Sequence, residues 1–228
     1  MRPTILKRTV GEFIGTAFLV AAVVGSGIMA ERLSGGNAAL SLLANTIATG
    51  AALIALILAF GPISGAHFNP VVTVADALNH GLPRKDVFCY VLAQIVGGIC
   101  GTIAANAMFG LALVSRSHHT RTGFTQYLSE FIATFGLMCV IWGCSRSRPD
   151  MVSFAVGGYI VAAYWFTAST SFANPAVTIA RAFSDTFTGI RLVDVFPFIF
   201  AQFAGGISAT ALFHWLNPAS QPDAAAAL

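Results

Sequence analysis

The sequence predicts an all-α membrane protein in which six transmembrane helices and two re-entrant half-helices form an inverted repeat. Three observations lead to this prediction: a hydrophobic composition, long apolar stretches, and similar segments that recur in both halves of the chain. Of the 228 residues, 56% are hydrophobic and only 9% are charged, whereas a soluble domain carries about 25% charged residues. Most of the protein surface is therefore expected to face lipid.

Six apolar stretches are long enough to cross a membrane, since about 20 residues of helix span the bilayer core. We predict spans near residues 10–29, 39–60, 86–113, 124–144, 151–170 and 192–216. The first span is too long for a removable signal peptide and has no small-residue cleavage site. An even number of spans puts both chain termini on the same side of the membrane.

The basic residues favour cytoplasmic termini by a small excess under the positive-inside rule. In that orientation the inner side holds Arg2, Lys7, Arg8, Arg84, Lys85, Arg146 and Arg148, and the outer side holds Arg32, Arg116, Arg121, Arg181 and Arg191. The net charge of +3 is too small and scattered to indicate nucleic-acid binding. The short termini favour a multi-pass protein of a bacterial inner membrane.

The two halves of the chain are internal repeats. Residues 12–16 recur at 130–134, residues 64–78 recur at 169–183, and Ala93-Gln94 recurs as Ala201-Gln202. Each half has three spans, so the second half must be inverted relative to the first. We divide the chain into a first repeat (1–115), a linking loop (116–123), a second repeat (124–217) and a disordered tail (218–228).

Each repeat contains an Asn-Pro pair, at Asn69-Pro70 and Asn174-Pro175. Asn is a preferred helix N-cap and Pro is favoured at the first helical position, so each pair should begin a short helix. Inversion brings the two positive helix ends together near the membrane centre. The cap occupies each Asn carbonyl and leaves its NH₂ group free to donate into a lumen.

These paired motifs, each preceded by a Glu-x-x-x-Thr segment, resemble the aquaporin/aquaglyceroporin superfamily (the major intrinsic protein family) over about residues 9–216. The resemblance implies a right-handed helical bundle, a pore in each protomer with Asn69 and Asn174 at its midpoint, and a homotetramer in the lipid bilayer. Its partners would be small neutral solutes, without a metal or cofactor. Val71 departs from the usual Asn-Pro-Ala, which predicts bulkier packing where the half-helices touch.

The resemblance also implies a selectivity filter of four side chains. Counted from the asparagines, these are Thr49, Ala162, Ser171 and Val177. Val177 stands where the family ordinarily has an arginine, which would bring a fixed cation and five N–H donors. The substitution predicts a wide, arginine-less filter. Such a filter suits water, glycerol and larger uncharged solutes such as urea or trivalent metalloid hydroxides, including arsenite.

Two further residues near this filter have less certain roles. Arg181 lies one helical turn beyond Val177, and we favour an arginine that snorkels to lipid headgroups or pairs with Asp185. The alternative is a basic ring at the outer vestibule. Phe172 lies inside the second re-entrant segment. We favour a position in the protein core or facing lipid, and the alternative is a pore-lining position.

Glu12 and Glu130 are acids within the membrane, where charges are costly and often functional. The resemblance implies that each carboxylate accepts hydrogen bonds from backbone N–H groups of a re-entrant loop, and their symmetry favours this scaffold role. It also places His67 in the inner part of the pore as a neutral side chain.

The leading hypothesis is a passive channel for neutral solutes. The alternatives are an ion-coupled secondary transporter that uses Glu12 and Glu130, and an ion channel. No pattern in the sequence predicts an enzyme, since it has neither a phosphate-binding loop nor a paired-histidine zinc motif.

Overall fold

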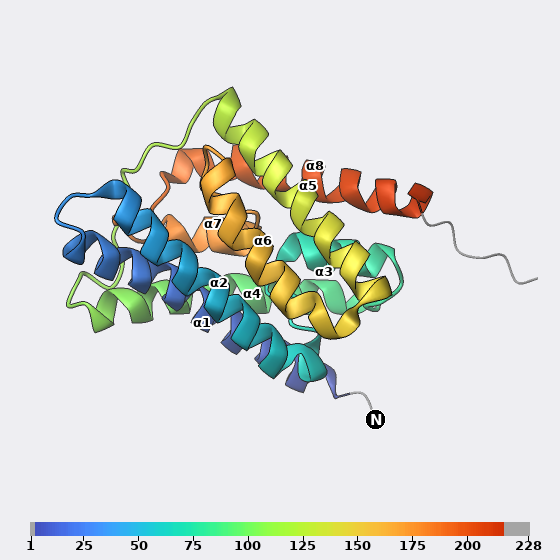
Figure 1. The fold of residues 1–228 in the computed structure, drawn as a ribbon. Helices are drawn as coiled ribbons and strands as arrows, with labels where there is room; N and C mark the ends of the chain where they lie inside the picture. The colour runs from blue at the N-terminus through green and yellow to red at the C-terminus, as the bar shows by residue number, and fades with distance from the viewer. Residues whose placement is uncertain (1–2, 217–228) are drawn as a thin grey trace, which may run out of the picture.

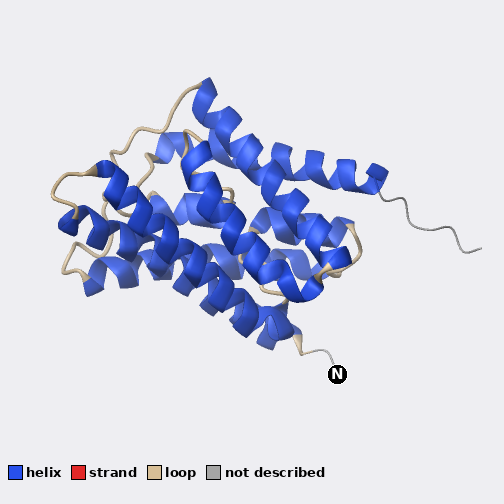
Figure 2. Ribbon diagram, in the orientation of Figure 1, coloured by secondary structure: helices blue, strands red, loops and turns tan. Residues whose placement is uncertain are grey.

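The computed structural model describes residues 3–216, and its regular elements there are all helical (Figure 2). The predicted disordered tail, 218–228, lies outside the described residues. The helices are α1 (Ile5–Leu33), α2 (Ala38–Ser64), α3 (Pro70–Leu78), η1 (Arg84–Asp86), α4 (Val87–Met108), α5 (Phe124–Ser147), η2 (Pro149–Met151), α6 (Val152–Phe166), α7 (Pro175–Arg181) and α8 (Leu192–Leu216).

Five helical segments of the described chain are long and apolar enough to cross a membrane: α1, α2, η1 with α4, α5 and α8. The sixth, α6, has 15 residues and occupies the place of the predicted span 151–170. That span ends early because the backbone turns extended at Thr167. The predicted span 86–113 ends at Met108, and Gly110 follows with φ +67, a left-handed conformation typical of a helix C-terminus.

The two halves have the same order of elements: two long helices, a half-helix and a further long helix. In the first half α1 packs on α2 and α4, and in the second half α5 packs on α6 and α8. The halves meet through α2 with α6, α4 with α7, and α3 with α8. Figure 1 shows the first and last described residues at the same end of the bundle, on the right, as an even number of crossings requires.

Two glycines in equivalent positions bring long helices into backbone contact. A Cβ atom on Gly97 of α4 would overlap the Phe13 carbonyl oxygen of α1, and one on Gly205 of α8 would overlap the Phe131 carbonyl oxygen of α5. Small residues allow this close approach in membrane bundles, where packing rather than burial from water drives helix association. The glycines therefore fix the spacing of the helices that support each half-helix.

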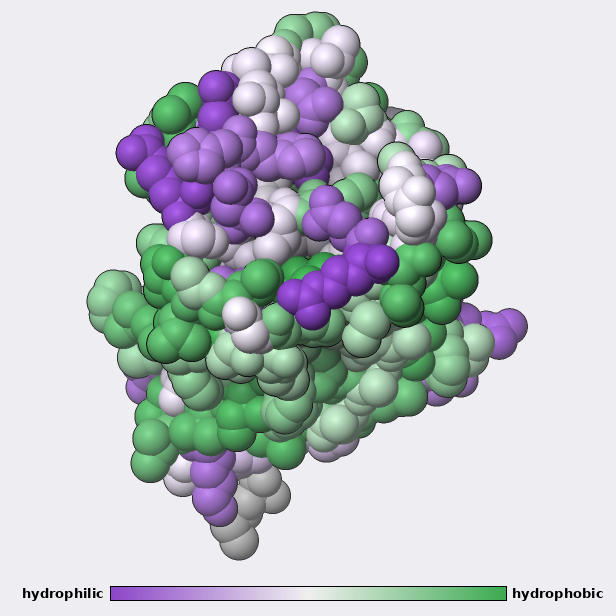
Figure 3. All heavy atoms as spheres, turned by 90° about the vertical axis from the view of Figure 1, so that its left-hand side faces the viewer, coloured by the Kyte–Doolittle hydropathy of each residue, from purple (hydrophilic) through white to green (hydrophobic). Residues whose placement is uncertain are grey.

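The outer surface of the bundle is apolar. Large hydrophobic side chains are exposed along the long helices, among them Phe18, Phe88, Phe124, Phe196 and Phe200. Figure 3 looks onto the loop end that lies at the left of Figure 1. Hydrophilic residues gather in the upper half of this face, and hydrophobic residues cover most of its lower half. This distribution fits a helical bundle whose sides face lipid.

Candidate functional site

The two half-helices begin at the predicted asparagines. Asn69 and Asn174 have extended backbones, and each side chain caps its own helix. Asn69 Oδ1 accepts a hydrogen bond from Val71 N (3.0 Å), and Asn174 Oδ1 accepts from Ala176 N (2.9 Å) and Val177 N (3.3 Å). Both predicted helix starts and both caps are confirmed.

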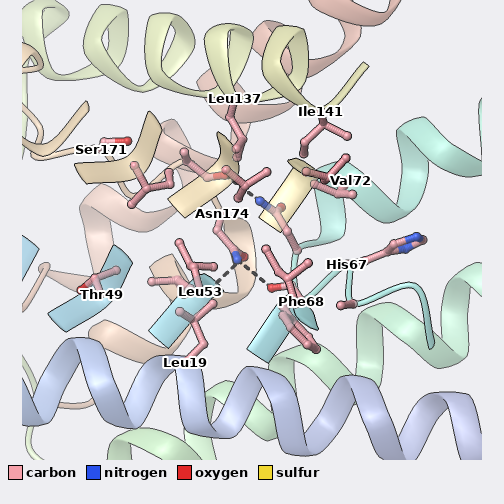
Figure 4. Close-up of a pocket in the computed structure, with 18 of the residues that line it drawn as sticks. Leu19, Thr49, Leu53, His67, Phe68, Val72, Leu137, Ile141, Ser171 and Asn174 are labelled. Carbon is pink, nitrogen blue, oxygen red and sulfur yellow. Dashed lines mark hydrogen bonds between the residues drawn. The ribbon is translucent and has the colours of Figure 1, made fainter. Parts of the chain in front are cut away.

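The two asparagine amides also bind the opposite loop. Asn69 Nδ2 donates to the Ala173 carbonyl (2.8 Å). Asn174 Nδ2 donates to the Phe68 carbonyl (2.7 Å), as Figure 4 shows. The prediction that the NH₂ group of each asparagine is free is therefore wrong for one of its two N–H bonds, which binds a backbone carbonyl. The second N–H of each amide remains available to a molecule in the cavity.

The loops ahead of the half-helices have the same unusual backbone. Ala66 and Phe68 have φ angles of 50° and 48°, and the equivalent Ser171 and Ala173 have φ angles of 47° and 48°. Non-glycine residues seldom adopt positive φ. Such a conformation persists only where the surrounding structure holds it, so the groups that bind these loops are part of the site.

Glu12 of α1 holds the first loop. It is fully buried, and its Oε1 accepts hydrogen bonds from Ser64 Oγ (2.6 Å) and His67 N (3.0 Å). Its Oε2 accepts from Phe68 N (2.7 Å) and Gln94 Nε2 (2.8 Å). Both carboxylate oxygens are thus occupied by donors of the loop and its supporting helices.

Glu130 of α5 holds the second loop in the same way. It is also fully buried, with Oε1 accepting from Phe172 N (2.9 Å) and Oε2 accepting from Ala173 N (2.9 Å) and Gln202 Nε2 (2.7 Å). The predicted contacts between these acids and the loop N–H groups are confirmed. Because buried donors without acceptors are costly, both acids stabilise the strained loop backbone.

A cavity of about 430 Å³ surrounds the asparagines. Thr49 and Ser171 lie to one side of Asn174, and His67 lies on the opposite side, toward α3 (Figure 4). Much of the wall is apolar, formed by Leu19, Val23, Leu53, Ile57, Val72, Leu137, Ile141 and Val156. A largely apolar cavity with a few polar side chains is typical of a site for small molecules.

Three of the four predicted filter residues line this cavity: Thr49, Ser171 and Val177. Ala162 does not, and the prediction for it is wrong, since Ala162 is exposed on the outer face of α6. Ile160 and Tyr164 line the cavity instead, four residues apart on one helix face. The Tyr164 hydroxyl lies 3.3 Å from Thr49 Oγ1.

Arg181 and Phe172 also line the cavity. The favoured interpretation of Arg181 is therefore wrong. Phe172 packs in a buried core cluster with Phe198, as favoured, and it borders the cavity as well. Arg181 is 2% exposed and its Nε donates to the Thr188 carbonyl. Its guanidinium carbon lies 3.4 Å from the centre of the Phe172 ring, and Asp185 instead accepts a hydrogen bond from His118 N. Fully buried and held in this way, Arg181 reaches neither lipid headgroups nor Asp185.

His67 lines the cavity as predicted. Its Nδ1 lies 3.2 Å from Thr73 Oγ1, and its Nε2 lies 3.5 Å from Asp76 Oδ2. The ring also packs against Tyr90, with 5.5 Å between the ring centres. Three neighbours thus fix the imidazole at the end of the cavity opposite Thr49 and Ser171 (Figure 4).

The sequence reasoning missed Arg121, which it placed only among the outer charges. Arg121 is 8% exposed, and it donates through Nε to the Gly189 carbonyl (2.8 Å) and through Nη1 to the Ser169 carbonyl (3.0 Å). Burial lowers the pKa of Arg121 to about 10, while the negative charge of Glu130 opposes this change. The residue is still protonated near pH 7.

An inverted helical repeat whose half-helices converge on an asparagine pair inside a cavity defines a multi-pass membrane channel. The family model "Major intrinsic protein" matches residues 1–152. The chain belongs to this family, whose members are channels and not enzymes.

Similar proteins agree with this assignment. The chain is 51% identical to aquaglyceroporin AqpS of Rhizobium meliloti, over 95% of this chain and 92% of that protein. It is 31% identical to the probable aquaporin AqpM of Archaeoglobus fulgidus, over 95% and 99%. The X-ray structure of the aquaglyceroporin from Plasmodium falciparum has the same fold, with a TM-score of 0.71 at 21% identity over 95% of this chain and 97% of that chain.

Proposed function

We propose that the protein is a passive channel for water, glycerol and larger uncharged solutes, such as urea and trivalent metalloid hydroxides including arsenite. The observation that carries this proposal is the pair of asparagine amides, each with one N–H left for the apolar-walled cavity. A solute hydroxyl can accept from these donors while its carbon skeleton contacts the wall. The name of the 51% identical relative, an aquaglyceroporin, supports glycerol as a solute.

We propose a filter formed by Thr49, Tyr164, Ser171 and Val177, with Arg181 at its outer edge. Val177 leaves space where an arginine would narrow the cavity, and two hydroxyls and the phenol offer hydrogen bonds to polyhydroxylated solutes. The earlier expectation of a filter without an arginine is modified, because the buried Arg181 guanidinium borders the same cavity. Its positive charge, one turn outward, opposes the passage of cations.

The contacts of Glu12 and Glu130 favour a scaffold role over ion coupling. A carrier carboxylate must exchange protons or ions with solution, whereas both acids are fully buried and each oxygen accepts a hydrogen bond. We therefore do not favour the ion-coupled transporter.

We further propose a homotetramer in a bacterial inner membrane, with both termini in the cytoplasm and with repeats at 1–115 and 124–217 joined by the loop 116–123. The exposed apolar helix faces support burial against lipid and neighbouring protomers, and the basic residues support the orientation. Native mass spectrometry in detergent tests the assembly, and labelling of a cysteine introduced at either terminus tests the orientation.

Stopped-flow light scattering of proteoliposomes tests the proposed solutes. We expect permeability to water, glycerol, urea and arsenite above that of protein-free liposomes of the same lipid and size. Water permeability without any increase for the three larger solutes would contradict the wide filter, and no increase for any solute would contradict the channel.

A further inference from the structure

A second cavity, of about 260 Å³, lies next to the main cavity and shares one wall with it. Arg181 lines both, so the second cavity is the outer vestibule of the proposed pore. The other polar residues in its wall are Asn45, His119, Thr120, Arg121, Gln126 and Thr170. The residues that line it include two arginines and no carboxylate.

Both arginines are buried, and neither has an ion-pair partner in the part of the chain that the structure describes. Among residues 3–216, neither Arg121 nor Arg181 has a carboxylate oxygen within salt-bridge distance. Each instead donates to backbone carbonyls, those of Gly189 and Ser169 for Arg121 and that of Thr188 for Arg181. A buried ion without a counter-charge is unfavourable, and carbonyl dipoles offset only part of this cost.

The acidic residues nearby are engaged elsewhere. Glu130 attracts both arginines at longer range, but its oxygens accept from the loop N–H groups described above. Asp194 accepts from the Arg121 backbone N–H (2.9 Å) and from the Arg191 side chain (3.0 and 3.2 Å). The vestibule therefore keeps an excess of positive charge that the protein itself does not neutralise.

The two guanidinium groups are close enough to share one ligand. Their carbons lie 4.8 Å (Arg121) and 3.4 Å (Arg181) from one point, the centre of the Phe172 ring, so they are at most about 8 Å apart. A tetrahedral oxyanion between them can receive charge-assisted N–H···O bonds of about 2.8 Å from each side. Thr170, whose hydroxyl lies 3.5 Å from Arg121 Nη1, adds a donor at the same wall.

We propose that this vestibule, bounded by Arg121 and Arg181, is a binding site for a tetrahedral oxyanion at the outer mouth of the channel. The planar guanidinium fork matches such oxygens, and two buried forks without carboxylate partners at one cavity provide both the charge and the geometry. A bound oxyanion lies against Arg181, at the entrance to the main cavity. The site thus goes beyond the proposed conduction of neutral solutes.

Calorimetric titration of the purified, detergent-solubilised assembly with sodium sulfate tests this proposal, with sodium chloride at equal ionic strength as the reference. We expect saturable binding of one sulfate per chain. His119→Asp puts a carboxylate beside both arginines from an exposed loop position and should weaken sulfate binding at least about tenfold, which corresponds to about 1.4 kcal/mol. His118→Asp is the matched control, because this exposed neighbour does not line the vestibule, and it should change the affinity less than about twofold.

A second pair of variants tests the arginine itself. Arg121→Gln removes one of the two guanidinium groups and should abolish sulfate binding. Arg116→Gln, an exposed change of equal charge in the same loop, should not. If Arg121→Gln does not fold, the histidine pair decides the question. Absence of saturable sulfate binding to the unmodified protein, or equal weakening by His118→Asp and His119→Asp, would overturn the proposal. The titration involves no transport, so its result is independent of which solutes the channel conducts.

Discussion

Removal of the Glu130 carboxylate tests whether this acid holds the second re-entrant loop. In Glu130→Ala, three buried N–H bonds lose their acceptor: those of Phe172 N and Ala173 N, and one of the two on Gln202 Nε2. The other N–H of Gln202 still donates to Thr178 Oγ1 (2.8 Å). Each such donor costs about 1–3 kcal/mol, so the variant should lose about 3–9 kcal/mol if all three stay unsatisfied. Folded proteins are stable by only about 5–15 kcal/mol, so we expect a large fall in the unfolding temperature together with loss of glycerol flux.

The assay is thermal unfolding in detergent, followed by glycerol flux in proteoliposomes that contain equal amounts of folded protein. Glu31→Ala is the matched control, since Glu31 is exposed at the end of α1 and such a change alters stability by about 0.5 kcal/mol or less. Glu130→Gln should fall between them, because it keeps one acceptor but turns an NH₂ group toward an N–H donor. A Glu130→Ala variant as stable and permeable as Glu31→Ala would refute the scaffold role. A stable variant that loses only pH-driven accumulation would instead support ion coupling.

Substitutions in three other parts of the site test the remaining assignments. Asn174→Asp, and equally Asn69→Asp, places a carboxylate oxygen where an N–H donor faced the carbonyl of the opposite loop. Solute flux should therefore be lost, and planar-bilayer recordings should show increased cation passage. Unchanged flux in both folded variants would exclude these residues from the pore midpoint. Gly206→Ala adds a Cβ that overlaps Val71, so the folded protein should lose about 1–3 kcal/mol of stability, measured by thermal unfolding. The double variant Gly206→Ala with Val71→Ala should recover most of this loss. If it does not, the overlap is not the cause of the lost stability. Val177→Arg should lower the glycerol-to-water permeability ratio sharply, while Val177→Leu lowers it less; an unchanged ratio for the folded arginine variant would remove Val177 from the constriction.

Features specified by neighbouring residues were predictable from the sequence. The half-helices α3 and α7 begin at Pro70 and Pro175, as the Asn-Pro pairs indicate, because the cap and the first helical residue act locally. The contacts of Glu12 and Glu130 were also predictable, since their symmetry in the two repeats marks equivalent roles.

Features that depend on loop conformation were not predictable. Eight residues separate α6 from α7, whereas five separate α2 from α3. A count of residues back from Asn174 therefore crosses extended backbone, where the helical period does not apply, and it reached Ala162 instead of Tyr164.

The positions of Arg121 and Arg181 depend on contacts distant from local sequence patterns. Their acceptors are carbonyls of Ser169, Thr188 and Gly189, which come together only in the folded protein. A composition rule places such arginines at the membrane surface, and no local pattern predicts their burial. Val71 is a similar case, because it packs against Gly206 of α8 rather than only between the half-helices.

Uptake of labelled glycerol into proteoliposomes under imposed ion gradients tests the central claim, a passive pore, most directly. Uptake is measured with and without an inward proton or sodium gradient. The internal glycerol concentration should rise to the external value and stop there, at the same level with either gradient. A transient or sustained internal concentration above the external one, present only when a gradient is imposed, would contradict the channel and favour coupled transport.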